Sequence, residues 1–118
     1  MLLVDDDANY RRALASFLEA SFDIRIVGET GNGAEAAALA GSLRPDAAVV
    51  DLAMPGGGGL DVAAGILEAA PGTAVVVVTG VEGSEDDRRR ADELGVAAWL
   101  PKGDPLQVEN ALRSLAPR

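Results

Sequence analysis

Short apolar runs alternate with amphipathic stretches five times along the chain. The apolar runs predict β-strands at residues 2–4, 24–27, 47–50, 74–78 and 96–100. Between the runs, apolar residues recur at helical spacing and predict helices with one buried face each. Such alternation is typical of a parallel sheet with helices on both faces, joined by right-handed crossovers.

The helical stripes predict which side chains face the sheet. The expected inward residues are Tyr10, Ala13, Leu14, Phe17 and Leu18 in the first helix, Ala36, Leu39, Ala40 and Leu43 in the second, Leu60, Ala63, Ala64 and Leu67 in the third, and Val108, Ala111, Leu112 and Leu115 in the last. Boundary signals accompany these stripes. They are Pro45 after the second helix, Pro71-Gly72 after the third, a capping box of Ser84 and Asp87 before the fourth, Leu94-Gly95 at its end, and Asp104-Pro105 before the last.

Composition limits the kinds of function. At 118 residues and 48% hydrophobic content, residues 1–118 are expected to form one domain with no second domain in this chain. The absence of cysteine and histidine excludes disulfides, thiolate metal sites and a histidine base. The net charge of −9 argues against direct nucleic-acid binding. No stretch resembles a membrane span or signal peptide, so the cytoplasm is the expected location.

Polar side chains follow four of the predicted strands. Asp5 and Asp6 follow the first strand, Asp51 ends the third, Thr79 ends the fourth and Lys102 follows the fifth. These positions share the carboxyl edge of a parallel sheet, where ligands bind in such folds. Three clustered carboxylates repel one another and call for a cation, and oxygen ligands favour Mg²⁺, Mn²⁺ or Ca²⁺.

Lys102 adds a second clue to the chemistry of this edge. It is the only lysine in the chain, and its flexible positive charge suits a phosphoryl oxygen. Carboxylates such as Asp51 act as nucleophiles in aspartyl-phosphate chemistry. The residues therefore indicate phosphoryl transfer onto an aspartate, with Mg²⁺ neutralising charge.

Four motifs together resemble the bacterial response-regulator receiver domain. They are Leu3-Val4-Asp5-Asp6, the run from Pro45 to Pro55 with Gly59, Val78-Thr79, and Trp99-Leu100-Pro101-Lys102. The match covers essentially the whole chain in order. It implies the flavodoxin-like (βα)5 fold, with a doubly wound parallel sheet of strand order 2-1-3-4-5.

The resemblance implies a phosphoacceptor and a metal site. Asp51 would accept the phosphoryl group. Asp6 would bind Mg²⁺ directly and Asp5 largely through water, with Asp51 and the backbone carbonyl of Ala53 as further ligands, and Mn²⁺ could replace Mg²⁺.

It also implies a sensor. Lys102 and Thr79 would bind the phosphoryl group, and Thr79 and Trp99 would form the conformational switch. This chain departs from the family at three places: tryptophan replaces the usual Tyr or Phe at 99, Gly80 stands where Ala is commoner, and residues 56–59 are all glycine.

The resemblance further implies partners. The expected phosphoryl donor is a sensor histidine kinase, and the expected output surface is the fourth helix, fifth strand and fifth helix, which could also form a homodimer. DNA would be reached only through an output domain not present here. The stretch 101–105 is similar to regulators with a helix-turn-helix effector, which suggests transcription control. Such a domain would not be an enzyme, apart from its own phosphorylation and dephosphorylation.

Three alternatives stand beside this interpretation. Asp5-x-Asp7, Thr79 and Lys102 also resemble motifs of haloacid-dehalogenase-type phosphatases, although that reading leaves Asp51 without a role. A receiver could instead act purely as a binding module, without phosphorylation. The run 88–90 is three arginines, but flanking acids favour a solvated, salt-bridged helix face over a nucleic-acid contact.

Overall fold

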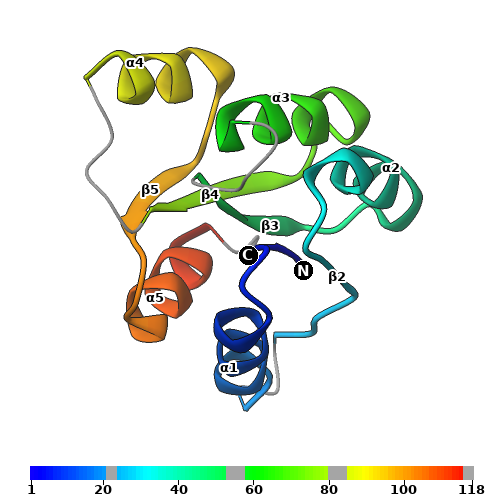
Figure 1. Cartoon of the computed structure of the whole chain (residues 1–118), viewed down its shortest axis with the longest axis vertical. Helices are drawn as coiled ribbons and strands as arrows, with labels where there is room; N and C mark the ends of the chain where they lie inside the picture. Colours follow the sequence, from blue (N-terminus) through cyan, green and yellow to red (C-terminus); the bar gives the residue numbers. More distant parts are fainter. Residues whose placement is uncertain (21–23, 53–57, 80–84, 116–118) are drawn as a thin grey trace.

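Five strands and five helices alternate along the chain (Figure 1). The computed structural model describes residues 1–20, 24–52, 58–79 and 85–115. The elements are β1 (Leu2–Val4), α1 (Ala8–Glu19), β2 (Gly28–Thr30), α2 (Gly33–Leu43), β3 (Ala47–Asp51), α3 (Gly59–Ala69), β4 (Ala74–Thr79), α4 (Glu85–Leu94), β5 (Ala98–Pro101) and α5 (Pro105–Leu115).

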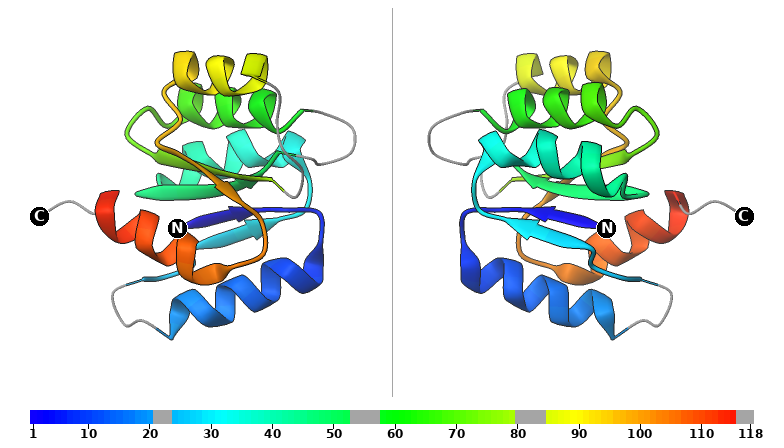
Figure 2. Two further views of the ribbon diagram at one scale, coloured as in Figure 1. Left: turned by 90° about the vertical axis from the view of Figure 1, so that its left-hand side faces the viewer. Right: turned by 90° about the vertical axis from the view of Figure 1, so that its right-hand side faces the viewer.

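The strands form one parallel sheet in the order β2-β1-β3-β4-β5. Figure 2 shows α1 and α5 on one face of this sheet and α2, α3 and α4 on the other. The order and the two helical layers confirm the predicted flavodoxin-like fold.

The side chains of β4 show how one strand supplies both cores. Val75 and Val77 belong to the cluster beneath α2 and α3, whereas Val76 and Val78 belong to the cluster beneath α1 and α5. Successive side chains of a strand point to opposite faces, so an unbroken apolar run is required when both faces are covered. All four valines are fully buried.

The second strand lies later in the sequence than predicted. The apolar run 24–27 is not a strand, and β2 is instead Gly28–Thr30. The reason is its partner, because Leu2 to Val4 of β1 pair in register with Gly28 to Thr30. The fifth strand is displaced in the same way: Val96 still donates its N–H to the carbonyl of Ala91 in α4, and β5 begins at Ala98.

Several expected inward side chains are exposed. In α1 the buried residues are Leu14, Ala15 and Leu18, so Ala13 and Phe17 lie outside the core-facing stripe. Leu43 and Leu115 are also exposed. Each is the last residue of its helix.

Polar side chains cap the starts of α1, α2 and α5. Asp7 caps α1 by accepting from the N–H groups of Asn9 and Tyr10, and Asn32 caps α2 in the same way. Asp104 accepts from the N–H of Leu106 at the start of α5, as predicted. The helix before Pro45 ends at Leu43, with Arg44 in the left-handed conformation at φ 46°. Ser84 of the predicted capping box lies outside the described residues.

Within the described residues, no helix combines the length and hydropathy needed to cross a bilayer.

Candidate functional site

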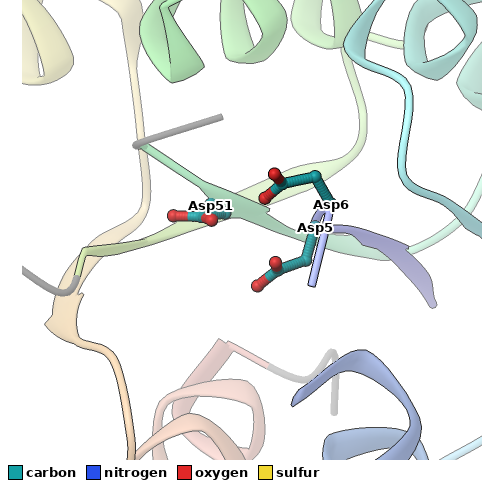
Figure 3. Close-up of side chains that lie close together, drawn as sticks. All are labelled: Asp5, Asp6 and Asp51. Carbon is teal, nitrogen blue, oxygen red and sulfur yellow. The ribbon is translucent and has the colours of Figure 1, made fainter. Parts of the chain in front are cut away.

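Three carboxylates meet at the carboxyl edge of the sheet (Figure 3). Asp5 and Asp6 follow β1, and Asp51 is the last residue of β3. One carboxylate oxygen from each lies within 4.8 Å of the others. Asp5 and Asp51 are buried, with exposed fractions of 4% and 3%, and Asp6 is exposed. Because β1 and β3 are neighbours in register, residues 46 positions apart reach the same point.

Lys102 joins this cluster from the far side of β4. Its Nζ donates to Asp5 Oδ1 and Asp51 Oδ2, both at 3.2 Å, and lies 3.0 Å from Asp5 Oδ2. The lysine side chain is 19% exposed. The single ammonium group therefore bridges the two buried carboxylates, which weakens their mutual repulsion.

The environment changes the proton affinity of this network. Burial raises the pKa of Asp5, and the charge of Asp51 adds to that effect, while hydrogen bonds from Asp7 and Lys102 oppose it. Burial alone would lower the pKa of Lys102, but its bonds to Asp5 and Asp51 outweigh burial, so the pKa is raised. Lys102 is therefore a cation at neutral pH.

The carboxylate cluster has the properties of a hard-cation site. All its side-chain donors are oxygens, which are the ligands that Mg²⁺ prefers. Asp5 Oδ2 is buried and, within the described residues, accepts no hydrogen bond, although it forms an ion pair with Lys102 Nζ at 3.0 Å. A buried carboxylate oxygen without a hydrogen bond is costly, and a divalent cation would satisfy it. The residues present therefore fit the predicted ion, whereas the Ala53 carbonyl lies outside the described residues.

Arg11 holds the first acidic residue in place. Its guanidinium donates to the backbone carbonyl of Asp5 and to the side chain of Glu29. The Asp5 carboxylate also accepts from the N–H of Asp7 at 2.9 Å. Sequence reasoning missed Arg11, because contacts between α1, β1 and β2 depend on the tertiary fold.

Thr79 and Trp99 occupy different parts of the predicted switch. Thr79 is buried at the end of β4, and its carbonyl accepts from the N–H of Lys102 at 2.8 Å. Trp99 lies within β5, paired with Val77, and packs partly buried against the α2–α3 core. Thr79 thus adjoins the carboxylate cluster, while Trp99 lies deeper in the sheet.

The comparisons with known proteins agree with this geometry. The model of the family "Response regulator receiver domain" matches residues 1–113. The chain belongs to the response regulator receiver family. That assignment removes the phosphatase alternative, and it agrees with Asp7 serving as the cap of α1.

Two curated relatives of this receiver domain are longer proteins that carry different functional names. The chain is 33% identical over 116 residues to the transcriptional regulatory protein LiaR of Bacillus subtilis, covering 97% of this chain and 54% of LiaR. It is 37% identical to a protein-glutamate methylesterase/protein-glutamine glutaminase of Methanospirillum hungatei, covering 97% of this chain and 36% of that protein. The chain thus spans about half or less of the length of these curated relatives.

A solved structure extends the comparison to the site. A response regulator of Burkholderia pseudomallei, described with a phosphorylated aspartic acid, a calcium ion and citrate, has a TM-score of 0.81 at 26% identity. The match covers 94% of this chain and 64% of that one.

A glycine shapes the chain beside Asp51 of this receiver domain. A Cβ on Gly59 would lie 2.3 Å from the Cα of Leu52 and 2.6 Å from the carbonyl oxygen of Asp51. The Gly59 N–H also donates to the Leu52 carbonyl at 3.0 Å. Only glycine allows α3 to begin this close to the end of β3.

The arginine run on α4 is engaged within the domain. Arg89 pairs with Asp86, Arg90 pairs with Asp61 of α3, and Arg88 lies over the ring of Trp99 at 5.8 Å. These contacts agree with the predicted salt-bridged helix face.

Proposed function

We propose that this receiver domain accepts a phosphoryl group on Asp51 from a sensor histidine kinase. The observation that carries the proposal is the placement of Asp51 within one hydrogen bond of Lys102 and beside two further carboxylates. A buried acid at that edge, paired with an ammonium group and beside two further carboxylates, suits phosphoryl transfer better than acid–base catalysis. The phosphorylated aspartic acid named for the Burkholderia pseudomallei relative supports the same chemistry.

The reaction requires one bond to form and one to break. An oxygen of the Asp51 carboxylate bonds to phosphorus, and the bond from phosphorus to the donor nitrogen breaks, with its electron pair leaving on the imidazole. Lys102 stands where a phosphoryl oxygen on Asp51 would lie within reach of its ammonium group. A preorganised charge at that position stabilises the negative charge of the transition state.

Asp5, Asp6 and Asp51 would hold Mg²⁺, with the Ala53 carbonyl as an expected further ligand and Mn²⁺ as a substitute. When bound, the ion supplies neutralisation of charge on the transferring group. Arg11 contributes by fixing the backbone of Asp5, and therefore the direction of its carboxylate.

Signal output would follow from the new charge on Asp51. Phosphorylation adds nearly two negative charges. Lys102 and the hydroxyl of Thr79 would bind them, and Trp99 would follow, altering the surface of α4, β5 and α5. That surface would contact an output partner or a second receiver in a homodimer. We place the domain in the cytoplasm and its output in transcription, as for LiaR, with DNA bound by a separate domain.

Intact-mass spectrometry after treatment with acetyl phosphate and Mg²⁺ tests the acceptor. We expect one added phosphoryl group on the wild-type chain and none on Asp51→Asn. Asp7→Asn is the matched control, because asparagine caps a helix as well as aspartate, and it should be labelled like wild type. Equal labelling of wild type and Asp51→Asn would overturn the assignment.

Omitting Mg²⁺ tests the ion in the same assay, and labelling should then fall to background. A wild-type domain that takes no phosphoryl group and binds partners unchanged would instead support a pure binding module.

A further inference from the structure

Tyr10 lies against the lysine of the site. The Lys102 ammonium nitrogen is 4.6 Å from the centroid of the Tyr10 ring, within the range of a cation–π interaction. Both residues are unique, since the chain has one tyrosine and one lysine. Neither the carboxylate cluster nor the proposed reaction gives Tyr10 a role.

The position of Tyr10 is fixed by the start of α1. Its backbone N–H donates to the capping carboxylate of Asp7 at 3.1 Å, and its side chain packs against the core beneath α1 and α5. Its hydroxyl is buried and lies near the backbone of Gly103. Burial raises its pKa, so the ring is neutral at physiological pH. The ring of Tyr10 is the part of the side chain that faces the Lys102 ammonium group.

The Tyr10 ring faces the Lys102 ammonium group, which Asp5 and Asp51 already share. Lys102 donates to Asp5 and Asp51, and the negative face of an aromatic ring attracts the same charge without competing for either carboxylate. A lysine side chain otherwise has many rotamers and loses considerable entropy when one is selected. A fixed ring beside the ammonium group reduces the number of positions that it can occupy.

We propose that Tyr10 is a positioning residue that holds the Lys102 ammonium group between Asp5 and Asp51 through the face of its ring. This inference rests on the proposed function for its effect on phosphorylation, but the positioning itself exists in the unphosphorylated protein. A receiver with an aliphatic residue here would leave the lysine free to turn away from the acceptor. The ring therefore increases the rate at which Asp51 is phosphorylated.

Phosphorylation rates of two variants separate the ring from the hydroxyl. Tyr10→Phe keeps the ring and removes only the hydroxyl, so its labelling rate by acetyl phosphate should match wild type. Tyr10→Leu removes the ring, and its rate should fall roughly threefold to thirtyfold, the range set by measured cation–π energies. Equal rates for Tyr10→Leu and wild type, or a faster rate for Tyr10→Leu, would overturn the proposal.

A double-mutant cycle excludes a purely structural role. In a Lys102→Met background, Tyr10→Leu should slow labelling no further, because there is no ammonium group left to position. An equal slowing in both backgrounds would show that Tyr10 acts through packing, and would overturn the proposal. If Tyr10→Leu does not fold, pentafluorophenylalanine at position 10, compared with phenylalanine, inverts the charge of the ring face at similar size and should slow labelling.

Nuclear magnetic resonance tests the positioning without phosphorylation. Lysine labelled with ¹³C gives a signal from Lys102 alone, because the chain has no other lysine. The protons beside its ammonium group should be shifted upfield by the ring in wild type and Tyr10→Phe, and this shift should vanish in Tyr10→Leu. If wild type shows the upfield shift but accepts no phosphoryl group, the proposed function is refuted and the positioning of Lys102 by Tyr10 still holds. Absence of the shift in wild type would refute the positioning.

Discussion

Helices α3 and α4 pack side by side but are held by different forces. α3 buries Gly59, Leu60, Ala63 and Ile66 against the sheet, whereas α4 buries only Ala91. The contacts of α4 are instead surface pairs, such as Arg90 with Asp61 and Arg88 over Trp99. Exposed contacts of these kinds contribute about 1 kcal/mol or less each. We expect α4 to shift at lower cost than α3, which packs against the sheet beside Asp51.

Removing a buried side chain from α3 should have the largest effect on this comparison. Ile66 is fully buried, so Ile66→Ala should lower the free energy of unfolding by about 2–5 kcal/mol, since it leaves a cavity. Urea denaturation followed by circular dichroism measures the change. Glu93→Ala on the exposed side of α4 is the control and should change stability by less than about 0.5 kcal/mol. Similar losses for both would remove the distinction between the helices.

Alanine substitutions at two glycines of α3 should change the stability of the domain in opposite directions. Gly59→Ala should destabilise the domain by about 1–3 kcal/mol, because its Cβ would collide with the backbone of Leu52. Gly65→Ala should stabilise it by about 0.5–1 kcal/mol, because its Cβ would meet only the Ala37 side chain at 3.4 Å within a helix. Thermal unfolding of both variants provides the measurement, and a stabilised Gly59→Ala would contradict the close approach.

The buried carboxyl group of Asp5 should make the stability of the domain depend on pH. Burial raises the pKa of Asp5 in the folded state, so the native protein holds this proton more tightly than the unfolded chain. The contribution of Asp5 is therefore most favourable at low pH and is lost as pH rises from the ordinary pKa through the raised one. Asp5→Asn should raise the urea midpoint at pH 7, and the gain should disappear below the ordinary pKa. A gain that persists at low pH would indicate a cause other than ionisation.

Breaking one contact of α4 should have the smallest effect on stability. Arg88→Ala removes the charge over Trp99 and should cost about 0.5–1 kcal/mol. Trp99 is the only tryptophan, so its fluorescence reports the change directly. Arg89→Ala removes only an exposed pair with Asp86 and should leave the emission unaltered. Equal spectral changes in the two variants would show that Arg88 does not contact the ring.

Sequence patterns predicted the fold well because apolar runs and caps act locally. The strand containing Asp51 and the helix start at Asp104 are both found where they were expected. β2 was misplaced, since strand position depends on the register with β1 and the run 24–27 is as apolar as a strand.

For the site, the sequence placed Asp5, Asp51 and Lys102 at one edge, because parallel strands end together. The roles of Arg11 and Tyr10 could not be predicted, because each depends on how α1 crosses the sheet. The only signal was Asp7, whose cap fixes where the first turn of that helix begins.

The weak anchoring of α4 has a consequence for evolution. Most of its side chains can be exchanged without loss of buried contacts, because only Ala91 lies in the core. Under the proposed function, mutations there would alter which partner is recognised and leave the carboxylate cluster intact. Along the seam between α2 and α3, by contrast, Gly41 faces Ala69 and Gly65 faces Ala37, and residues larger than alanine would force the helices apart. If α4 is the output surface, a lineage of such domains would acquire new partners by changes in that one helix and keep the proposed reaction.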